Sequence, residues 1–391
     1  MRIALVIEFF DPAGGGAQRT VAELARHLRD RGHEVTVLCA DTPDSPPTDM
    51  ESIRIEKSGK GKPLLAWGVW RFRRWATQRV SGGDFDVSLD VTGRVPATIV
   101  LPLGGTTKES QKQQVASLAS PLARFIKRLA LFFLPKQWLL RWYEWRTFRD
   151  RRVKHIVAAS NYILRMLQEG ARVPRERITM IPAAVDVPAV SAEQRSAWRA
   201  QVRQGFKVPE DSVAYLFVAT NPHLKGIEPL MLAFKKLRER GVSATLLLAG
   251  ANRFDDQKRA AALGIRDGVR FVGQTQNMPM LYCAADVTVA PTFYDPVGRV
   301  VIESIALGTP VIPSVFAGSA SQIVVDGQER GGRVIGDPWA IDFLVDAMAF
   351  LADADQRATR AEACREKSPE LAMGPFLDEL ERLEKASADA G

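Results

Sequence analysis

Short apolar runs alternate along the chain with amphipathic stretches of helical length. The runs predict strands at residues 3–7, 34–39, 86–89, 97–101, 155–159 and 178–181, and again at 213–219, 244–249, 269–272, 287–290 and 310–313. Runs that are apolar on both faces and separated by helices are typical of parallel sheets covered by helices. Because the series occurs twice, the pattern predicts an α/β fold with two doubly wound domains.

A linker separates the two series. Residues 182–189 contain two prolines, which neither continue a helix nor pair within a central strand. We therefore place one domain at 1–184 and the other at 190–391, with the last helix of the chain packing back on the first domain. Ligands of such sheets bind at the carboxyl ends of the strands, so the expected main site is an inter-domain cleft.

The first predicted strand leads into a glycine-rich loop. Gly14, Gly15 and Gly16 precede a helix predicted over 21–31, and such a loop lets the backbone approach an anion at a helix N-terminus. Arg19 stands where a dinucleotide-binding fingerprint has its third glycine, and no Gly-Lys-Ser/Thr follows. From these residues alone, a phosphate site and a merely tight strand-to-helix turn are equally good interpretations.

Three features of the second half are arranged as they would be around a nucleotide diphosphate. Lys225 follows the carboxyl end of the strand predicted at 213–219 and can reach a phosphate as a point charge. A second strand ends in Gly273, which suits it to lie against a flat base. The third and most specific feature is the segment YDPVGRVVIESIALGTPVI at residues 294–312.

In that segment Gly298 opens a predicted helix, whose first N–H groups can hold a diphosphate. Asp295 precedes the helix and Glu303 lies within it, and a carboxylate at either place can accept hydrogen bonds from sugar or ribose hydroxyls. Taken singly, each acid has a structural alternative, Asp295 as a helix N-cap and Glu303 as a helix-surface acid. The whole segment favours the functional interpretation.

Composition excludes several classes of protein. Three cysteines and four histidines are scattered through 391 residues, which excludes a disulfide scaffold and indicates no metal site. Cysteine usage of this kind is expected in the reducing cytosol. No apolar run approaches the roughly 18 residues that span a membrane.

The net charge of +8 is concentrated in one segment. Residues 121–155 contain ten lysines and arginines and only two acids, together with eight aromatic residues, which we expect to divide evenly between core and surface. Basic amphipathic helices rich in Trp and Phe lie in membrane interfaces. Within a membrane-facing segment at 107–150, the predicted contacts are Arg124, Lys127, Arg128, Trp138, Arg141, Trp142 and Arg149. A smaller patch at 60–79, with three tryptophans, extends this surface.

The segment at 294–310 resembles the E-x7-E signature of the retaining GT-B glycosyltransferases of family 4, with Asp295 where the first glutamate is usual. The glycine loop and the Lys225 region match that family in position and order. Together, the stretches GGAQR at 15–19, WYEWRTF at 142–148 and ITMIPAA at 178–184 are similar to the lipopolysaccharide-core heptose glucosyltransferases within the family. The resemblance covers nearly the whole chain.

The resemblance implies a GT-B fold of two Rossmann-like domains and a hexosyltransferase that works on a nucleotide sugar, UDP-glucose in the narrower comparison. It implies Lys225 and Asp295 as catalytic residues. The implied substrate-binding residues are Gly15, Gly16, Asn221, Gly298, Arg299, Val300 and Glu303. Further implications are a lipid-anchored glycan acceptor, peripheral binding to the inner face of the cytoplasmic membrane, and a reaction without a resident cofactor or metal.

Two departures from the family pattern stand out. Leu224 occupies the place of an arginine that usually precedes the lysine, so one cation is missing unless Arg299 or another residue replaces it. Gly104 stands where the family has a histidine or aspartate that touches the donor sugar. These departures keep open a GT-B protein that has lost catalysis and serves as a binding module.

The sequence also leaves open a transferase for another envelope glycan, a nucleic-acid-binding protein and a dinucleotide-dependent oxidoreductase, although no nucleic-acid motif accompanies the basic charge.

Overall fold

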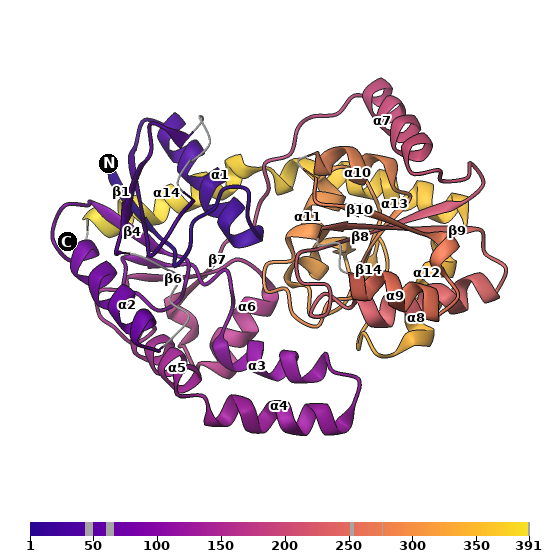
Figure 1. The fold of residues 1–391 in the computed structure, drawn as a ribbon. Coiled ribbons are helices and arrows are strands. Elements are labelled where there is room, and N and C mark those ends of the chain that lie inside the picture. The colour runs from indigo at the N-terminus through magenta and orange to yellow at the C-terminus, as the bar shows by residue number, and fades with distance from the viewer. Residues whose placement is uncertain (44–49, 60–65, 251–253, 276, 390–391) are drawn as a thin grey trace. The chain divides into compact units, whose positions relative to one another are not determined.

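The computed structural model describes residues 1–43, 50–59, 66–250, 254–275 and 277–389. The chain divides into two compact units, which Figure 1 colours along the sequence. Met1–Ala183 and Met373–Gly391 form the N-terminal unit, and Ala184–Ala372 form the C-terminal unit. The last helix is therefore part of the unit that begins the chain.

In the described residues, the N-terminal unit is built on a seven-stranded parallel sheet of order β3-β2-β1-β4-β5-β6-β7. Its strands are β1 (Arg2–Val6), β2 (Glu34–Cys39), β3 (Arg54–Lys57), β4 (Val87–Asp90), β5 (Ile99–Val100), β6 (His155–Ala158) and β7 (Ile178–Met180). The chain starts at the centre, winds outward to β3 and returns to continue on the other side of β1. This reversal defines the switch point at which doubly wound sheets bind ligands, next to the loops after β1 and β4.

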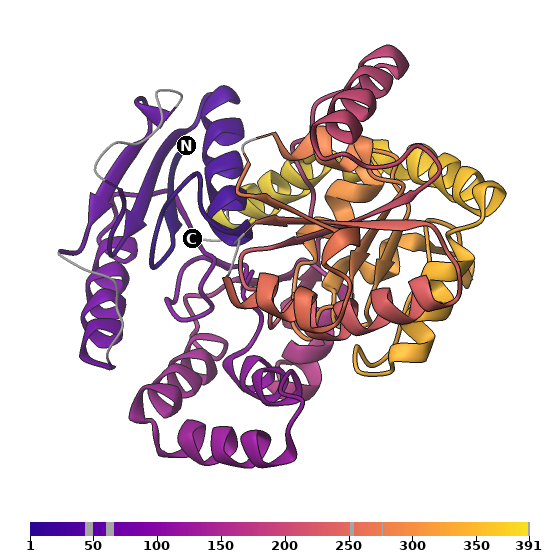
Figure 2. The ribbon, with the colours of Figure 1, turned by 45° about the vertical axis from the view of Figure 1, so that its right-hand side comes forward.

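Helices cover this sheet. They are α1 (Gly16–Asp30), α2 (Ala66–Val80), α3 (Thr107–Ala116), α4 (Pro121–Phe133), α5 (Pro135–Thr147), α6 (Asn161–Arg165) with the π turn Met166–Gly170, the 3-10 turn Arg175–Arg177, and α14 (Met373–Asp389). Arg31, at the end of α1, holds α14 through ion pairs with Asp378 (2.8 Å) and Glu381 (3.1 Å). Figure 2 shows α3, α4 and α5 as a separate helical layer of this unit, below its sheet.

Among the described residues, the C-terminal unit has a five-stranded parallel sheet of order β10-β9-β8-β11-β12 and a short antiparallel pair. The strands are β8 (Val213–Ala219), β9 (Ala244–Gly250), β10 (Val269–Gly273), β11 (Val287–Ala290), β12 (Val311–Pro313), β13 (Val324–Val325) and β14 (Gln328–Glu329). The helices are α7 (Ala192–Gly205), α8 (Ile227–Glu239), α9 (Phe254–Ala262), α10 (Met278–Ala284), α11 (Arg299–Ala306), α12 (Ile341–Phe350) and α13 (Ala354–Lys367), with the 3-10 turns Arg266–Gly268, Gly318–Ile323 and Ser368–Leu371.

Alternate residues of β8 and β9 bury opposite faces of this sheet. Tyr215 and Leu246 lie in a core with α8 and α12, whereas Leu216 and Leu247 lie in a core with α10. Burial on both faces explains why these strands form continuous apolar runs in the sequence. The predicted α/β fold with two doubly wound parallel sheets is confirmed.

Some predicted element bounds were wrong. The strand expected at 97–101 pairs only at Ile99–Val100, and the first helix begins at Gly16, directly in the glycine loop, instead of at residue 21. Strand β3, with the sequence RIEK, was not predicted because it is an edge strand whose residues are exposed or half-buried. An edge strand of this kind has no apolar run for a pattern to detect.

Candidate active site

The loop after β8 is fixed by a glycine in the left-handed region. Gly226 has a φ of 84°, and a Cβ there would lie 2.0 Å from the carbonyl oxygen of Pro291. Two residues before it, the carbonyl oxygen of Leu224 accepts a hydrogen bond of 2.9 Å from Phe293 N. The loop that carries Lys225 is therefore held against the segment that follows β11.

The two residues predicted to be catalytic are in contact. Lys225 Nζ lies 2.6 Å from Asp295 Oδ2, with 23% of the lysine side chain and 18% of the aspartate side chain exposed. Lys225 follows β8 and Asp295 follows β11, and these two strands are paired in the sheet. A diphosphate at this edge would compete with Asp295 for the ammonium group, because both are anionic.

Gly298 lies at the N-terminus of α11 and allows a close approach of two backbone segments. Its φ is 75°, and a Cβ would lie 2.7 Å from the backbone nitrogen of Ser319. Gly298 N also donates a 3.3 Å hydrogen bond to Asp295 Oδ1, so the aspartate is tied to both the lysine and the helix start. The first N–H groups of a helix, here those of Arg299 and Val300, have no intrahelical acceptors and suit an anion.

Glu303 is buried in the second turn of α11 and is not a helix-surface acid. Its Oε1 accepts a 2.7 Å bond from Arg299 Nε, and its Oε2 accepts a 2.8 Å bond from the Tyr282 hydroxyl. The predicted role of this carboxylate is to accept hydrogen bonds from the hydroxyls of a ribose, and that role stays a prediction. Tyr282 lies in the short apolar helix α10 and gave no signal in the sequence.

The ion pair between Arg299 and Glu303 shows whether Arg299 can replace the cation that is missing at Leu224. The Arg299 guanidinium is only 8% exposed and is neutralised by Glu303. It therefore does not replace the arginine that the family usually has next to the lysine. Asn221 is exposed in the loop after β8 and its carbonyl oxygen accepts a 3.1 Å bond from Lys225 N, while Val300 is half-buried in the first turn of α11.

The glycines predicted to bind a ligand in the N-terminal unit lie at the start of α1. Gly15 is the N-cap residue, without a side chain to cap the helix, and Gly16 is the first residue of the helix. Gly15 is half-buried, and a Cβ there would meet no atom within 4 Å. Gly104, in the loop after β5, is equally open.

A network of buried and half-buried charges joins α5 to the loops that follow β1, β4 and β5 in the N-terminal unit. Glu144 of α5 accepts a 2.9 Å bond from Thr107 N and a 3.5 Å bond from Arg94, which donates a 2.9 Å bond to Glu8 after β1. Burial raises the pKa of Glu144, and burial raises the pKa of Asp90 to about 6. Sequence reasoning missed this network, because charged residues scattered along the chain have no common spacing.

The cationic helices expose most of their aromatic residues. Helix α4 has no buried residue, and six of the eight aromatics at 121–155 are exposed, so the expected even division was wrong. Arginines stack over three of the tryptophans, which are Trp138 under Arg141, Trp142 under Arg146 and Trp145 under Arg149. In the patch at 60–79, Trp67 and Trp70 are exposed, while residues 60–65 lie outside the described residues.

Membrane spans and metal centres are both absent from the described part of the chain. None of its helices combines the length and the apolar character needed to cross a bilayer. In the same residues, no group of three or more His, Cys, Asp or Glu side chains could hold a metal ion.

The fold and the family models identify the chain as a GT-B glycosyltransferase. Residues 14–188 match the model of glycosyltransferase family 4, and residues 199–368 match that of glycosyl transferases group 1. The chain belongs to these glycosyltransferases and is an enzyme of that class, as the sequence motifs predicted. The catalytic and binding roles of the individual residues stay predictions.

Individual relatives include a lipopolysaccharide glucosyltransferase. WaaG of Escherichia coli K12 is 23% identical over 359 residues, which are 90% of each chain. An uncharacterised glycosyltransferase of Methanocaldococcus jannaschii is 36% identical over 128 residues, but these are only 31% of this chain and 33% of the relative.

Solved structures share the fold over nearly the whole chain. The crystal structure of WaaG, a glycosyltransferase involved in lipopolysaccharide biosynthesis, has a TM-score of 0.78 at 19% identity and covers 99% of both chains. Anabaena HepE in complex with UDP and glucose has a TM-score of 0.65 at 18% identity, covering 98% of this chain and 99% of its own.

Proposed function

We propose that the protein is a retaining hexosyltransferase that moves glucose from UDP-glucose to a lipid-anchored glycan, such as the heptose of a lipopolysaccharide core. The observation that carries this proposal is the convergence of Lys225, Asp295 and the N-terminus of α11 at one edge of the C-terminal sheet. That edge offers a cation and backbone donors to a diphosphate, and carboxylates to the hydroxyls of a sugar and a ribose.

In the proposed reaction, the bond between the anomeric carbon and the diphosphate oxygen breaks, and the bond to the acceptor hydroxyl oxygen forms on the same face. The acceptor proton passes to the leaving phosphate oxygen. Lys225 and the first N–H groups of α11 stabilise the negative charge that develops on the leaving group, which is the largest contribution such a site can make. Asp295 orients the transferred sugar and Glu303 holds the ribose. Because Lys225 and the α11 N–H groups stabilise the leaving group, the proposed reaction uses no metal.

Two of the relatives support the choice of substrates. HepE was crystallised in complex with UDP and glucose, and WaaG is a lipopolysaccharide glucosyltransferase.

A thermal-shift screen of UDP-, GDP- and ADP-sugars tests the donor, and we expect UDP-glucose to give the largest stabilisation. Equal stabilisation by GDP- or ADP-sugars would contradict the donor assignment. Binding without turnover would indicate the binding-only alternative, which Leu224 and Gly104 keep open.

Replacing Gly298 tests the helix N-terminus. In Gly298→Ala, the Cβ would overlap the backbone of Ser319, and the αL conformation adds about 1–2 kcal/mol of strain, so the start of α11 must shift. We expect UDP affinity, measured by calorimetry, to fall about tenfold or more. Gly327→Ala is the matched control, since Gly327 has a similar φ of 74° but no atom within 4 Å of its Cβ position. An equal loss of affinity in both variants would contradict a role of α11 in donor binding.

We propose in addition that the exposed faces of α4 and α5 bind the protein to the inner face of the cytoplasmic membrane, where a lipid-anchored acceptor is available. Each basic residue near an anionic surface contributes about 1 kcal/mol. The triple variant of Lys127, Arg146 and Arg149 to Gln should therefore bind anionic vesicles roughly 100-fold more weakly in a flotation assay. The control is a second triple variant, in which Gln replaces Lys235, Arg240 and Arg365. These three residues are similarly exposed in the C-terminal unit. Undiminished vesicle binding by the first variant would refute the membrane proposal.

A further inference from the structure

A cavity of about 650 Å³ lies between α3, α4 and α5 in the N-terminal unit. Its size is within the range of sites that hold one small ligand, roughly 300–1,000 Å³. Helix α4 forms one wall and buries none of its own residues. No residue of the glycine loop in the same unit belongs to the lining.

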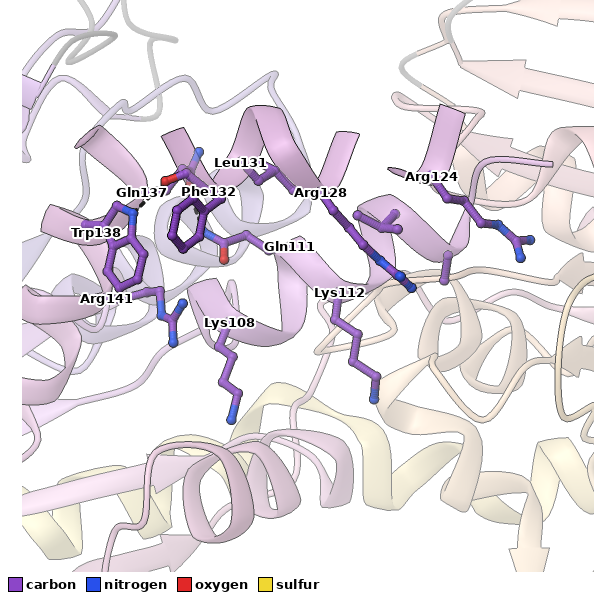
Figure 3. Close-up of a pocket in the computed structure, with 12 residues that line it drawn as sticks. Lys108, Gln111, Lys112, Arg124, Arg128, Leu131, Phe132, Gln137, Trp138 and Arg141 are labelled. Atoms are coloured by element: carbon purple, nitrogen blue, oxygen red, sulfur yellow. Dashed lines mark hydrogen bonds between the residues drawn. The ribbon is translucent and has the colours of Figure 1, made fainter. Parts of the chain in front are cut away.

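The walls of the cavity carry five cations and no carboxylate. Lys108 and Lys112 lie one helical turn apart on α3, and Arg124 and Arg128 lie one turn apart on α4. Arg141 of α5 is the fifth. Figure 3 shows the two lysines projecting in the same direction from α3. Like charges spaced in this way destabilise a helix, and a bound anion relieves the repulsion.

Most of this charge is not compensated by the protein. In the described chain, neither Lys108 nor Arg128 has a carboxylate partner, and Lys112 has only Glu109 at 3.6 Å. Arg124 Nε donates a 2.6 Å bond to the carbonyl oxygen of Leu118, which leaves its charge unpaired by an acid. The cavity therefore favours an anionic ligand.

One end of the cavity combines aromatic rings with a cation, because Arg141 lies beside Trp138 there. The rings of Phe132 and Trp138 meet edge to face with centroids 5.5 Å apart, and Figure 3 shows them beside each other at this end, away from Arg124. Trp138 Nε1 donates to the carbonyl oxygen of Phe132 at 2.7 Å, so the polar atom of the indole is satisfied, and the Arg141 guanidinium lies over the ring, 5.4 Å from its centroid. Leu131 and Val115 add aliphatic surface to the lining.

We propose that this cavity binds a single anionic phospholipid, with the phosphate between Lys108, Lys112 and Arg128 and an acyl chain along Phe132 and Trp138. A cavity whose lining combines five cations with aromatic and aliphatic side chains is complementary to a molecule that is anionic at its head and apolar in its tail. A free phosphate would leave the aromatic and aliphatic side chains unused. The proposal rests on the proposed function only for the presence of a membrane; it adds a specific lipid site to a general attraction between surfaces.

The test uses short-chain lipids as monomers, so that no membrane surface is present. Calorimetry of the full chain with dihexanoyl phosphatidylglycerol should give saturable binding of one molecule per chain. Dihexanoyl phosphatidylcholine and inorganic phosphate should each bind with an affinity at least about tenfold lower, a difference of about 1.4 kcal/mol. Ala116→Trp, which fills the cavity without changing its charge, should abolish lipid binding while binding to UDP is retained.

Charge variants separate the cavity from the outer surface. Lys108→Gln with Arg128→Gln should weaken binding of the short-chain phosphatidylglycerol about tenfold. Lys127→Gln with Arg146→Gln removes the same charge from the same helical layer outside the cavity, and should change the affinity less than about twofold. Equal effects of the two pairs, or binding that does not saturate, would overturn the lipid site. If phosphatidylglycerol binds at the cavity but vesicles are not bound, the membrane proposal fails and the lipid site stands.

Discussion

Lys225→Ala should lower the turnover number of glucose transfer by roughly 10²–10³-fold, because it removes a cation that lies beside Asp295 at the expected position of the leaving group. Donor binding should weaken much less, since the backbone of α11 and Glu303 still hold the nucleotide. The measurement is release of UDP from UDP-glucose in the presence of a core oligosaccharide that ends in heptose, combined with calorimetry of UDP.

A matched control exists on the helix that follows the Lys225 loop. Lys235 lies on α8, is 44% exposed and pairs with Glu239 on the solvent face. Lys235→Ala removes the same side chain without touching the site, and its kinetics should equal those of the unaltered enzyme. If Lys225→Ala also leaves kcat unchanged, Lys225 does not stabilise the leaving group and the catalytic assignment is wrong.

Glu303→Gln should weaken UDP binding by about 10–100-fold. Hydrogen bonds to a charged acceptor contribute about 1.5–3 kcal/mol, and the amide keeps the shape of the side chain while losing that charge. The variant also leaves the buried Arg299 guanidinium without its counter-charge, so the melting temperature should fall as well. UDP affinity is therefore measured by calorimetry at a temperature where circular dichroism shows the variant folded.

Tyr282→Phe separates support of Glu303 from direct binding. This change removes the 2.8 Å bond to Glu303 Oε2 but leaves the carboxylate and its arginine partner in place. We expect a loss of UDP affinity below about fivefold, as for a single neutral donor. Glu303→Gln binding UDP as tightly as the unaltered protein would remove Glu303 from the donor site.

The sequence predicted the fold class because both sheets are parallel and buried on two faces, which leaves continuous apolar runs. Lys225, Gly298 and Glu303 could be predicted as a group, because the carboxyl ends of neighbouring parallel strands meet at one edge. The contact between Lys225 and Asp295 could not, because it depends on how Gly226 folds its loop against Pro291. No short-range pattern encodes such a long-range approach.

Other parts of the site depend on packing that a sequence pattern does not contain. In the sequence, Tyr282 is only an aromatic residue in an apolar helix, and the structure alone shows that its hydroxyl donates to Glu303. The pairing of Arg94 with Glu8 and Glu144 joins three separate segments. The amphipathic pattern of α4 predicted an apolar face, but whether that face is buried depends on tertiary contacts, and α4 leaves it exposed.

An experimental structure of the protein with UDP bound is the decisive measurement for the donor site. We predict the diphosphate at the N-terminus of α11, with an oxygen within about 3.2 Å of Lys225 Nζ in place of Asp295, and the ribose hydroxyls on Glu303. UDP bound away from these residues, or a Lys225–Asp295 pair that persists with UDP in the crystal, would contradict this assignment.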